Sequence, residues 1–229
     1  MSTLFLSRAR LKRDASLASL AQLLMPGEVG ARTASSHRLV WALFADGPDR
    51  RRDFLWREEA PGRFMTLSAR PPHRLDDLFE LDSQEFAPAL ATGDRLGFTL
   101  RANPVIARSA GPGQRGKRHD VVMDALYQLP PKEDRAAHRL DAVVAAGRAW
   151  LERQGKAHGF TPDAGVDVDG YDTLTIPRDA GAKAAKFGVL DLTGILTVQD
   201  PGQFIDALAI GFGRARAFGC GLMLIRRAR

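Results

Sequence analysis

The spacing of hydrophobic positions changes several times along the first third of the chain, and each change marks an expected element. Residues 3–11 alternate between apolar and polar, which predicts a strand. Leucines three or four residues apart predict a helix over 15–25, and a second apolar stripe predicts a helix over 35–45. Two short runs, 52–58 and 63–69, are expected to form a strand pair around a Pro-Gly turn.

A short helix over 74–79 and a strand over 79–86 are expected next. The resulting order is strand, helix, strand, strand, helix, strand, with one additional helical segment. This is the ferredoxin-like order, in which four antiparallel strands are backed by two helices. The stretch 88–94 is the expected boundary between two domains, which would span 1–92 and 93–229.

The second half repeats this order of elements, although the residues themselves do not repeat. A long amphipathic helix is predicted over 133–153, and a second helix over 201–210 begins with proline, which suits a first turn. Four strands are predicted, at 95–107, 166–176, 186–198 and 222–225. The expected fold is therefore α+β, with two tandem ferredoxin-like βαββαβ domains. This topology also occurs in the RNA-recognition module, but the aromatic signature of that module is absent.

The amino-acid composition indicates a class of binding partner and a cellular compartment for this chain. The 229 residues include 33 Lys and Arg against 27 Asp and Glu, a net charge of +6, which favours a polyanionic partner. The single cysteine, Cys220, excludes an intrachain disulfide and a multi-cysteine metal site. We find no apolar run of membrane-spanning length and no signal peptide at the start, so a cytoplasmic protein without membrane contact is expected.

A glycine-rich loop at 211–225 follows the last predicted helix and leads into the last strand. Glycine permits backbone conformations that bring N–H groups close to an anion, and arginine offers a planar fork of donors for phosphate. The alternative is that the glycines only tighten a helix-to-strand turn. The residues expected to approach RNA are Gly211, Gly213, Arg214, Arg216, Gly219 and Gly221.

His37 is the candidate for proton transfer, because the pattern puts it in the first turn of the helix over 35–45, where an imidazole pKa falls. A partly exposed histidine without a catalytic role is the alternative. No histidine pair or carboxylate cluster has metal-ligand spacing, and neither G-x-S-x-G nor a P-loop is present. An enzyme built from this chain is therefore expected to need no metal and no cofactor.

Basic side chains gather in the second half and suggest contact with RNA phosphates. Each group could also be an ordinary solvated patch. The candidates are Arg115, Lys117 and Arg118 in the stretch 108–119, a separate basic loop that also contains glycines, Arg148, Arg153 and Lys156 near the end of the long helix, and Lys183 and Lys186 before a strand.

Four segments together resemble a known family. They are HRLVWALF at 37–44, FTLRANP at 98–104, the strand 186–198 that ends in GILTV, and the glycine-rich loop at 211–224. The chain resembles the CRISPR-repeat RNA endonucleases of type I-E systems, the CasE family. The resemblance implies two ferredoxin-like domains, metal-independent cleavage at the base of a repeat hairpin, and retention of the processed RNA (crRNA) within the Cascade complex.

The resemblance also implies individual roles. His37 matches the catalytic histidine of the family, and Lys186 and Lys183 match lysines near the scissile phosphate. Some members carry a tyrosine three residues before the histidine, where this chain has Ala34. Either Ser35 or Ser36 substitutes for that tyrosine, or His37 acts with lysine support only.

Two other classes of function stay open. The protein could hold hairpin RNA without cutting it, or it could be an unrelated basic interaction protein with two ferredoxin-like domains.

Overall fold

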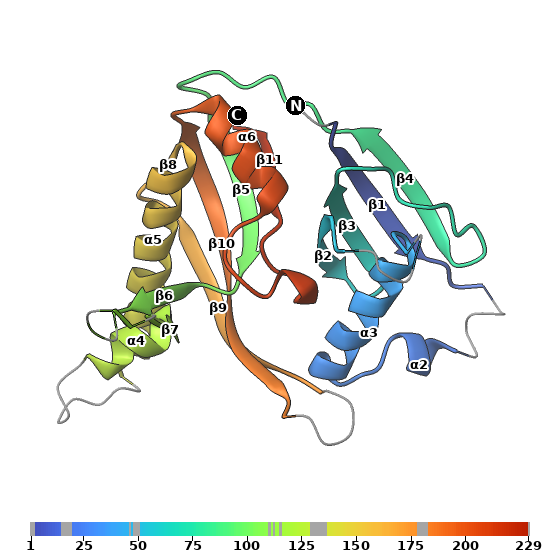
Figure 1. Cartoon of the computed structure of the whole chain (residues 1–229), viewed down its shortest axis with the longest axis horizontal. Coiled ribbons are helices and arrows are strands. Elements are labelled where there is room, and N and C mark those ends of the chain that lie inside the picture. Colours follow the sequence, from blue (N-terminus) through green and yellow to red (C-terminus); the bar gives the residue numbers. More distant parts are fainter. Residues whose placement is uncertain are drawn as a thin grey trace.

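The computed structural model describes residues 3–14, 20–45, 47, 51–109, 111, 113–114, 116–128, 137–177 and 183–228. Within these ranges the chain forms two antiparallel sheets, each with helices on one face (Figure 1). The other faces of the two sheets turn toward each other, and apolar residues from both meet there. In the described part, no helix is long and apolar enough to cross a membrane.

The N-terminal sheet has the order β2-β3-β1-β4, which is the ferredoxin-like order for its four strands. Alternate residues Phe54, Trp56 and Phe64 face helix α3 and pack against its buried Leu39 and Val40. This apolar layer holds α3 on the sheet. The elements are β1 (Phe5–Leu11), α2 (Ala21–Leu24), α3 (Val29–Ala42), β2 (Phe54–Ala60), β3 (Arg63–Ser68) and β4 (Phe79–Glu85).

Two expectations for this half are wrong. The short helix over 74–79 does not form, and a turn leads directly into β4 instead. Helix α3 begins at Val29 rather than at residue 35, because the Glu28 side chain accepts hydrogen bonds from the backbone N–H groups of Gly30 and Ala31, at 2.9 and 2.5 Å. The first turns of α3 carry few apolar residues, so periodicity does not reveal them.

The C-terminal sheet has the order β11-β5-β10-β8, and β9 also pairs with β10. Helices α5 and α6 cover its outer face through the largest apolar cluster of the described residues (Figure 1). In chain order, β5 is the first ferredoxin-like strand of this half, β8 and β9 form the second, β10 is the third and β11 the fourth. Across the sheet they lie in the order fourth, first, third, second, as in the ferredoxin-like fold.

The strands of this half are β5 (Arg95–Ala102), β6 (Val105–Arg108), β7 (Lys117–Asp120), β8 (Phe160–Pro162), β9 (Asp167–Ile176), β10 (Ala185–Val198) and β11 (Met223–Arg227). The helices are α4 (Val121–Tyr127), α5 (Arg139–His158), α6 (Pro201–Ile210) and the short 3₁₀ helix η1 (Arg216–Phe218).

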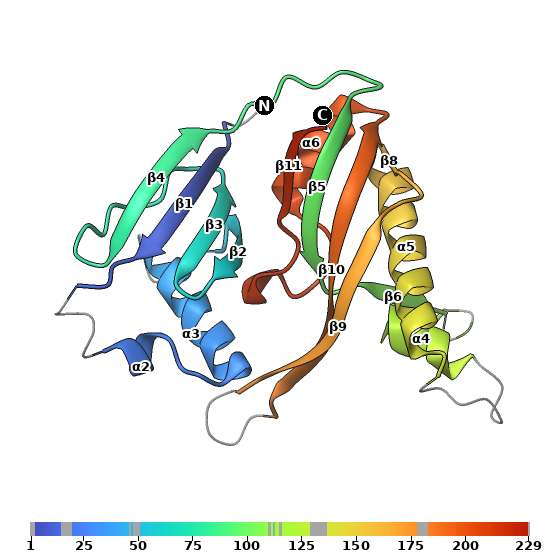
Figure 2. The ribbon, with the colours of Figure 1, turned by 180° about the vertical axis from the view of Figure 1, so that it is seen from behind.

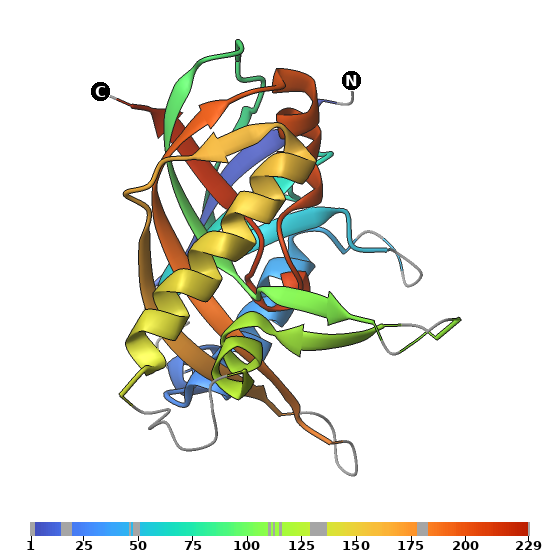
Figure 3. The same cartoon turned by 90° about the vertical axis from the view of Figure 1, so that its left-hand side faces the viewer.

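The strand expected over 95–107 is broken in two. The buried Asn103 donates its side-chain amide to the carbonyl of Gly188 at 2.7 Å, and Pro104 has no N–H for the ladder. The chain therefore leaves the sheet after β5 and forms the β6–β7 hairpin, which projects beside α4 (Figure 3). The pattern did not predict this hairpin, α4 or β8.

The two halves meet along a broad interface. Leu55, Met65 and Leu67 of the N-terminal sheet pack against Leu222. Arg57 reaches across the interface and donates to the side-chain oxygen of Thr99 at 3.0 Å. Farther along, strands β9 and β10 extend as a two-stranded ribbon that reaches α3 (Figure 2). The side chains between the halves are thus held from both sides.

Candidate active site

One stripe of helix α3 faces the C-terminal half of the molecule. Gly30, Ala34 and His37 follow one another at helical spacing, on the side of α3 opposite to the buried Leu39. A Cβ on Gly30 would lie 1.9 Å from the carbonyl oxygen of Thr175, so only glycine allows α3 to approach β9 this closely. The same approach carries His37 to the interface.

His37 lies between aromatic rings from both halves. Its ring centroid is 5.9 Å from that of Trp41 and 5.9 Å from that of Phe218, which belongs to the glycine-rich loop. Phe187 at the start of β10 stacks on Phe218 with centroids 5.6 Å apart. The structure therefore brings His37 together with the glycine-rich loop and with the first residues of β10.

Burial between these rings lowers the pKa of His37, and the positive charges of Arg52 and Arg38 lower it further. The sequence pattern predicts a lowered pKa for a different reason, a position at the helix start. That reason is wrong, because His37 lies about two turns inside α3. The imidazole is therefore mainly neutral at pH 7.

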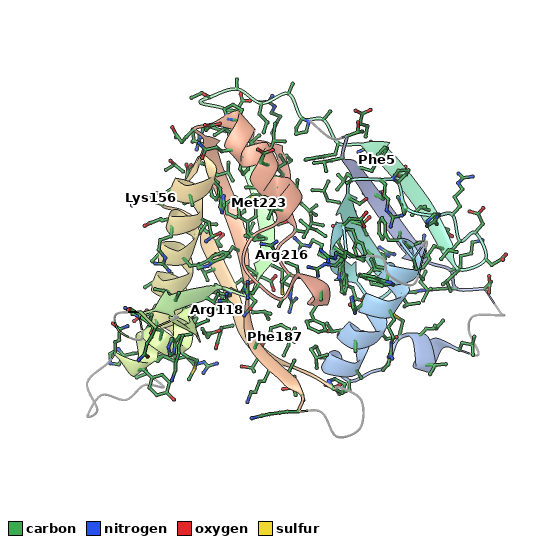
Figure 4. The ribbon with its side chains drawn as sticks, viewed as in Figure 1. Phe5, Arg118, Lys156, Phe187, Arg216 and Met223 are labelled. Atoms are coloured by element: carbon green, nitrogen blue, oxygen red, sulfur yellow. The ribbon has the colours of Figure 1, made fainter. Side chains whose placement is uncertain are left out.

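Arginines line the same part of the interface. Arg52 is half-buried just before β2, and its Nη1 is enclosed without a hydrogen-bond partner among the described residues. Burial together with the charge of Arg216 lowers the pKa of Arg52. Arg216 lies between the two halves in Figure 4 and donates from Nε to the carbonyl of Gly213 at 3.3 Å. In the described residues, no group of three or more His, Cys, Asp or Glu is arranged to hold a metal ion.

The two serines near His37 are committed to structural contacts. Ser35 donates to the carbonyl of Leu24 at 2.7 Å, and the fully buried Ser36 donates to Glu58 at 3.4 Å. Ala34 packs against the buried apolar cluster that Phe218 also contacts. This geometry favours the alternative in which His37 acts without a serine hydroxyl.

The glycine-rich loop joins α6 to β11, as expected, and its glycines serve the packing of the two halves. Gly211 lies against the side chain of Leu55, and Gly219 lies against the ring of Trp56, whose Nε1 donates to the carbonyl of Ala217 at 3.2 Å. Both glycines have positive φ, at 82° and 77°. Gly213 and Gly221 instead contact the backbone of Asn103 and Phe212. The loop is therefore an interdomain joint beside His37.

The predicted basic residues are spread over the C-terminal half. Lys183 and Lys186 are exposed near the start of β10, and Lys186 leaves the strand on the face opposite to Phe187. Arg153 and Lys156 are exposed on α5, whereas Arg148 is partly buried and donates to the carbonyl of Val166 at 2.9 Å. Of these five residues, only Lys186 and Lys183 are close in sequence to Phe187, which stacks on Phe218 beside His37.

The remaining basic candidates belong to the β6–β7 hairpin. Lys117 and Arg118 are exposed on β7, and Arg118 lies on the side of the C-terminal half away from the N-terminal half (Figure 4). Arg115 lies outside the described residues. Arg108 on β6 pairs with Asp124 of α4 at 2.5 Å, which braces the hairpin against that helix.

Sequence reasoning missed four residues that shape the site: Arg52, Phe187, Phe218 and Gly30. The sequence pattern places Arg52 in the strand expected over 52–58, and it treats the two phenylalanines as ordinary apolar positions. Only Phe218 carried a usable signal, because it lies inside the glycine-rich loop. The positions of the others depend on contacts between distant segments.

Comparisons with known proteins agree with this architecture. The chain is 27% identical over 195 residues to the CRISPR system Cascade subunit CasE of Escherichia coli K12, covering 82% of this chain and 88% of that protein. The structure of a CRISPR endoribonuclease Cse3 bound to a 19-nucleotide RNA superposes with a TM-score of 0.69 at 25% identity, over 99% of both chains.

A CRISPR-associated protein of Escherichia coli K-12, Cas6e, has the same fold, with a TM-score of 0.62 at 21% identity over 98% of this chain and 100% of that one. A family described as CRISPR associated protein matches residues 4–227, nearly the whole sequence. The chain therefore belongs to this family of CRISPR-associated proteins, as the resemblance to CasE implied.

Proposed function

We propose that the protein is a metal-independent endoribonuclease that cuts CRISPR precursor RNA at the base of the repeat hairpin. The processed RNA would stay bound, and the protein would act in the cytoplasm as a subunit of a type I-E Cascade complex. The relatives named as a Cascade subunit and as an RNA-bound endoribonuclease support the substrate class. The observation that carries the proposal is His37, mainly neutral and flanked by arginines at the junction of two ferredoxin-like halves.

The reaction needs only groups that this chain and its substrate supply. The ribose 2′-oxygen attacks the adjacent phosphorus, the bond from phosphorus to the 5′-oxygen breaks, and a 2′,3′-cyclic phosphate forms. Neutral His37 accepts the proton that leaves the 2′-hydroxyl, and the departing 5′-oxygen takes a proton from solvent water, to which His37 later returns its own. A positioned general base contributes about 10²–10⁴-fold to such a step.

Positive charge would stabilise the phosphorane that forms during the attack. Arg52 and Arg216 lie on the His37 side of the interface, whereas Lys186 leaves β10 on the face opposite to Phe187 and is proposed on the resemblance to the CasE family. We assign Lys186 to this role with Lys183 beside it. The buried Nη1 of Arg52, which has no hydrogen-bond partner in the part of the chain that the structure describes, supports a role for that residue as well.

The hairpin stem would lie on the C-terminal half. The β6–β7 hairpin carries Lys117 and Arg118, and α5 presents Arg153 and Lys156 to solvent. We assign residues 93–229 to RNA binding and residues 1–92 to the domain that supplies His37. Cleavage then requires both domains.

The test incubates the protein with its repeat RNA in EDTA and measures binding and cleavage of the same molecule. We expect the wild type to cut, and His37→Ala to bind with nearly unchanged affinity but to lose cleavage. His73→Ala, which changes an exposed histidine of the same half, is the matched control and should cut normally. A 2′-deoxy nucleotide before the cut should block the reaction.

Each alternative has its own outcome. Binding by the wild type without cutting would identify a non-cleaving hairpin-binding subunit. Loss of cutting only when EDTA is present would require a metal. Normal cutting by His37→Ala would remove that residue from the mechanism, and absence of binding would indicate an unrelated basic interaction protein.

A further inference from the structure

A polar cavity lies in the C-terminal half, beside the glycine-rich loop. It has a volume of about 230 Å³ and is bounded by the C-terminal part of α5, the end of α6 and the loop itself. The stripe Trp150, Gln154 and His158 of α5 forms one wall. The remaining lining residues are Val105, Ala207, Ile210, Gly211, Gly213, Arg214 and Arg216.

The chemistry of this cavity suits a nucleotide. Arg214 and Arg216 offer guanidinium donors, and His158 and Gln154 offer polar groups at the edge of a ring-sized space. Among the described residues that line the cavity there is no carboxylate. Trp150 is only 2% exposed and closes the floor. At the rim, Ile210 leaves 60% of its surface exposed, which provides an apolar contact for a base or ribose.

The backbone of the loop is shaped to leave this space open. Gly213 has a φ of 74°, and a Cβ there would lie 2.8 Å from the carbonyl oxygen of Asn103 and 3.2 Å from the indole of Trp150. Arg214 pairs through its backbone with Asn103, where β5 ends. The cavity is therefore held by the core of the C-terminal half, and its walls are in place before any ligand binds.

Arg216 connects the cavity with the His37 region. It lines the cavity, and its charge acts both on His158 inside the cavity and on Arg52 beside His37. In Figure 4 it lies between the two halves. An RNA backbone that passes over Arg216 would thus have its scissile phosphate on one side and a neighbouring nucleotide on the other.

We infer that this cavity is a subsite for one unstacked base of the RNA, belonging to a nucleotide that adjoins the scissile phosphate. The inference rests on the proposed function for the identity of the RNA. Arg214 and Arg216 bind the phosphate of that nucleotide, and Gln154 and His158 hydrogen-bond the edge of its base. Proteins that read single-stranded RNA commonly take unstacked bases into pockets with such polar and planar side chains.

Abasic substitutions test the subsite, because they remove a base and keep the backbone. Three repeat RNAs carry an abasic site at the nucleotide before the cut, at the nucleotide after it, or several nucleotides away. Each also carries a 2′-deoxy sugar at the cut, so that affinity is measured without cleavage. They are compared with the matching RNA that has all its bases, using the wild type and the Gln154→Ala/His158→Ala double variant.

For the wild type, one of the two abasic sites next to the cut should weaken binding about tenfold or more, and the distant one should not. The double variant should bind the complete RNA more weakly by a similar factor and should show no further loss with the abasic RNA. Gln84→Ala/His73→Ala, two exposed residues of the N-terminal half, is the matched control and should behave like the wild type.

Equal abasic penalties in the wild type and the double variant, or no penalty at either position in the wild type, would overturn the subsite. Thermal unfolding of the double variant excludes a general loss of folding as the cause of weaker binding. Cleavage of the all-ribose RNA is measured separately, so a failure of the proposed function is distinguished from a failure of the subsite.

Discussion

At the scale of single residues, the protonation of His37 is decided by what surrounds the ring. Trp41 and Phe218 remove it from water, which disfavours the charged form, and Arg52 and Arg38 add repulsion. Each influence lowers the pKa below the ordinary value of 6.5. The histidine therefore stays available to accept a proton over the whole neutral range.

This predicts a specific pH profile. The single-turnover rate of cleavage should rise with pH and level off, with a midpoint below 6.5, because the neutral imidazole is the active form. Arg52→Gln removes a neighbouring positive charge, so the pKa of His37 should rise and the midpoint should move to higher pH. Arg63→Gln, at an exposed position on β3, should leave the midpoint in place. A midpoint that moved down in Arg52→Gln would contradict this electrostatic account.

At the scale of elements, helix α3 packs through two of its faces. Leu39 and Val40 bury one face against the N-terminal sheet, and the stripe that contains Gly30 and His37 packs against the C-terminal half. The second face is not strongly apolar, because its close contacts are made with backbone and with aromatic edges. The contact at Gly30 thus determines how near His37 comes to the glycine-rich loop.

Gly30→Ala tests this constraint, because the packing at this position and the helix propensity of alanine act in opposite directions. Alanine is about 1 kcal/mol better than glycine inside a helix, yet here its Cβ would meet the carbonyl oxygen of Thr175. We expect the variant to be less stable by about 1–3 kcal/mol, as for other overpacked sites, and to cut RNA more slowly. Urea unfolding and single-turnover cleavage provide the measurements.

The control for this variant is Gly27→Ala, just before α3, where a new Cβ has no described neighbour within 4 Å. That change should leave both stability and cleavage close to wild type. If Gly30→Ala were as stable as Gly27→Ala, the close approach of α3 to β9 would not be a constraint on the fold.

At the scale of the whole molecule, the junction of the two halves is the functional unit. The glycine-rich loop contacts Trp56 and Leu55 of the N-terminal sheet, and Leu222 at its end is 1% exposed in the apolar cluster between the sheets. This cluster fixes the distance between His37 and the arginines of the loop. Hairpin binding, by contrast, is assigned to the C-terminal half alone.

Weakening the junction should therefore separate cleavage from binding. Leu222→Ala should lower the free energy of unfolding by about 2–5 kcal/mol, as expected for a buried leucine, and should slow cleavage more than it weakens binding of the hairpin. Leu140→Ala, at a position 72% exposed on α5, should change neither quantity appreciably. Equal losses of binding and cleavage in Leu222→Ala would argue against a two-domain active site.

The sequence alone determined the type and order of most elements, because alternation and helical spacing record which face of each segment is buried. Helix α6 occupies the predicted residues 201–210, and the strand ends of β4 and β10 agree to within a residue or so. The strand expected at 166–176 is β9, and Gly170 falls where its pairing with β10 shifts register, between Tyr171 and Asp169. His37 and the glycine-rich loop were also recognisable, through residue type and resemblance.

Tertiary structure decided what those residues contact. The side-chain cap at Glu28 moved the start of α3, and the bond from Asn103 to Gly188 together with Pro104 turned one expected strand into β5 and a separate hairpin. The partners of His37 come from β10 and from the loop after α6. Local pattern reports how much of a segment is buried, whereas the packing of two sheets selects which distant side chains bury it. The environment of His37 is a product of that packing.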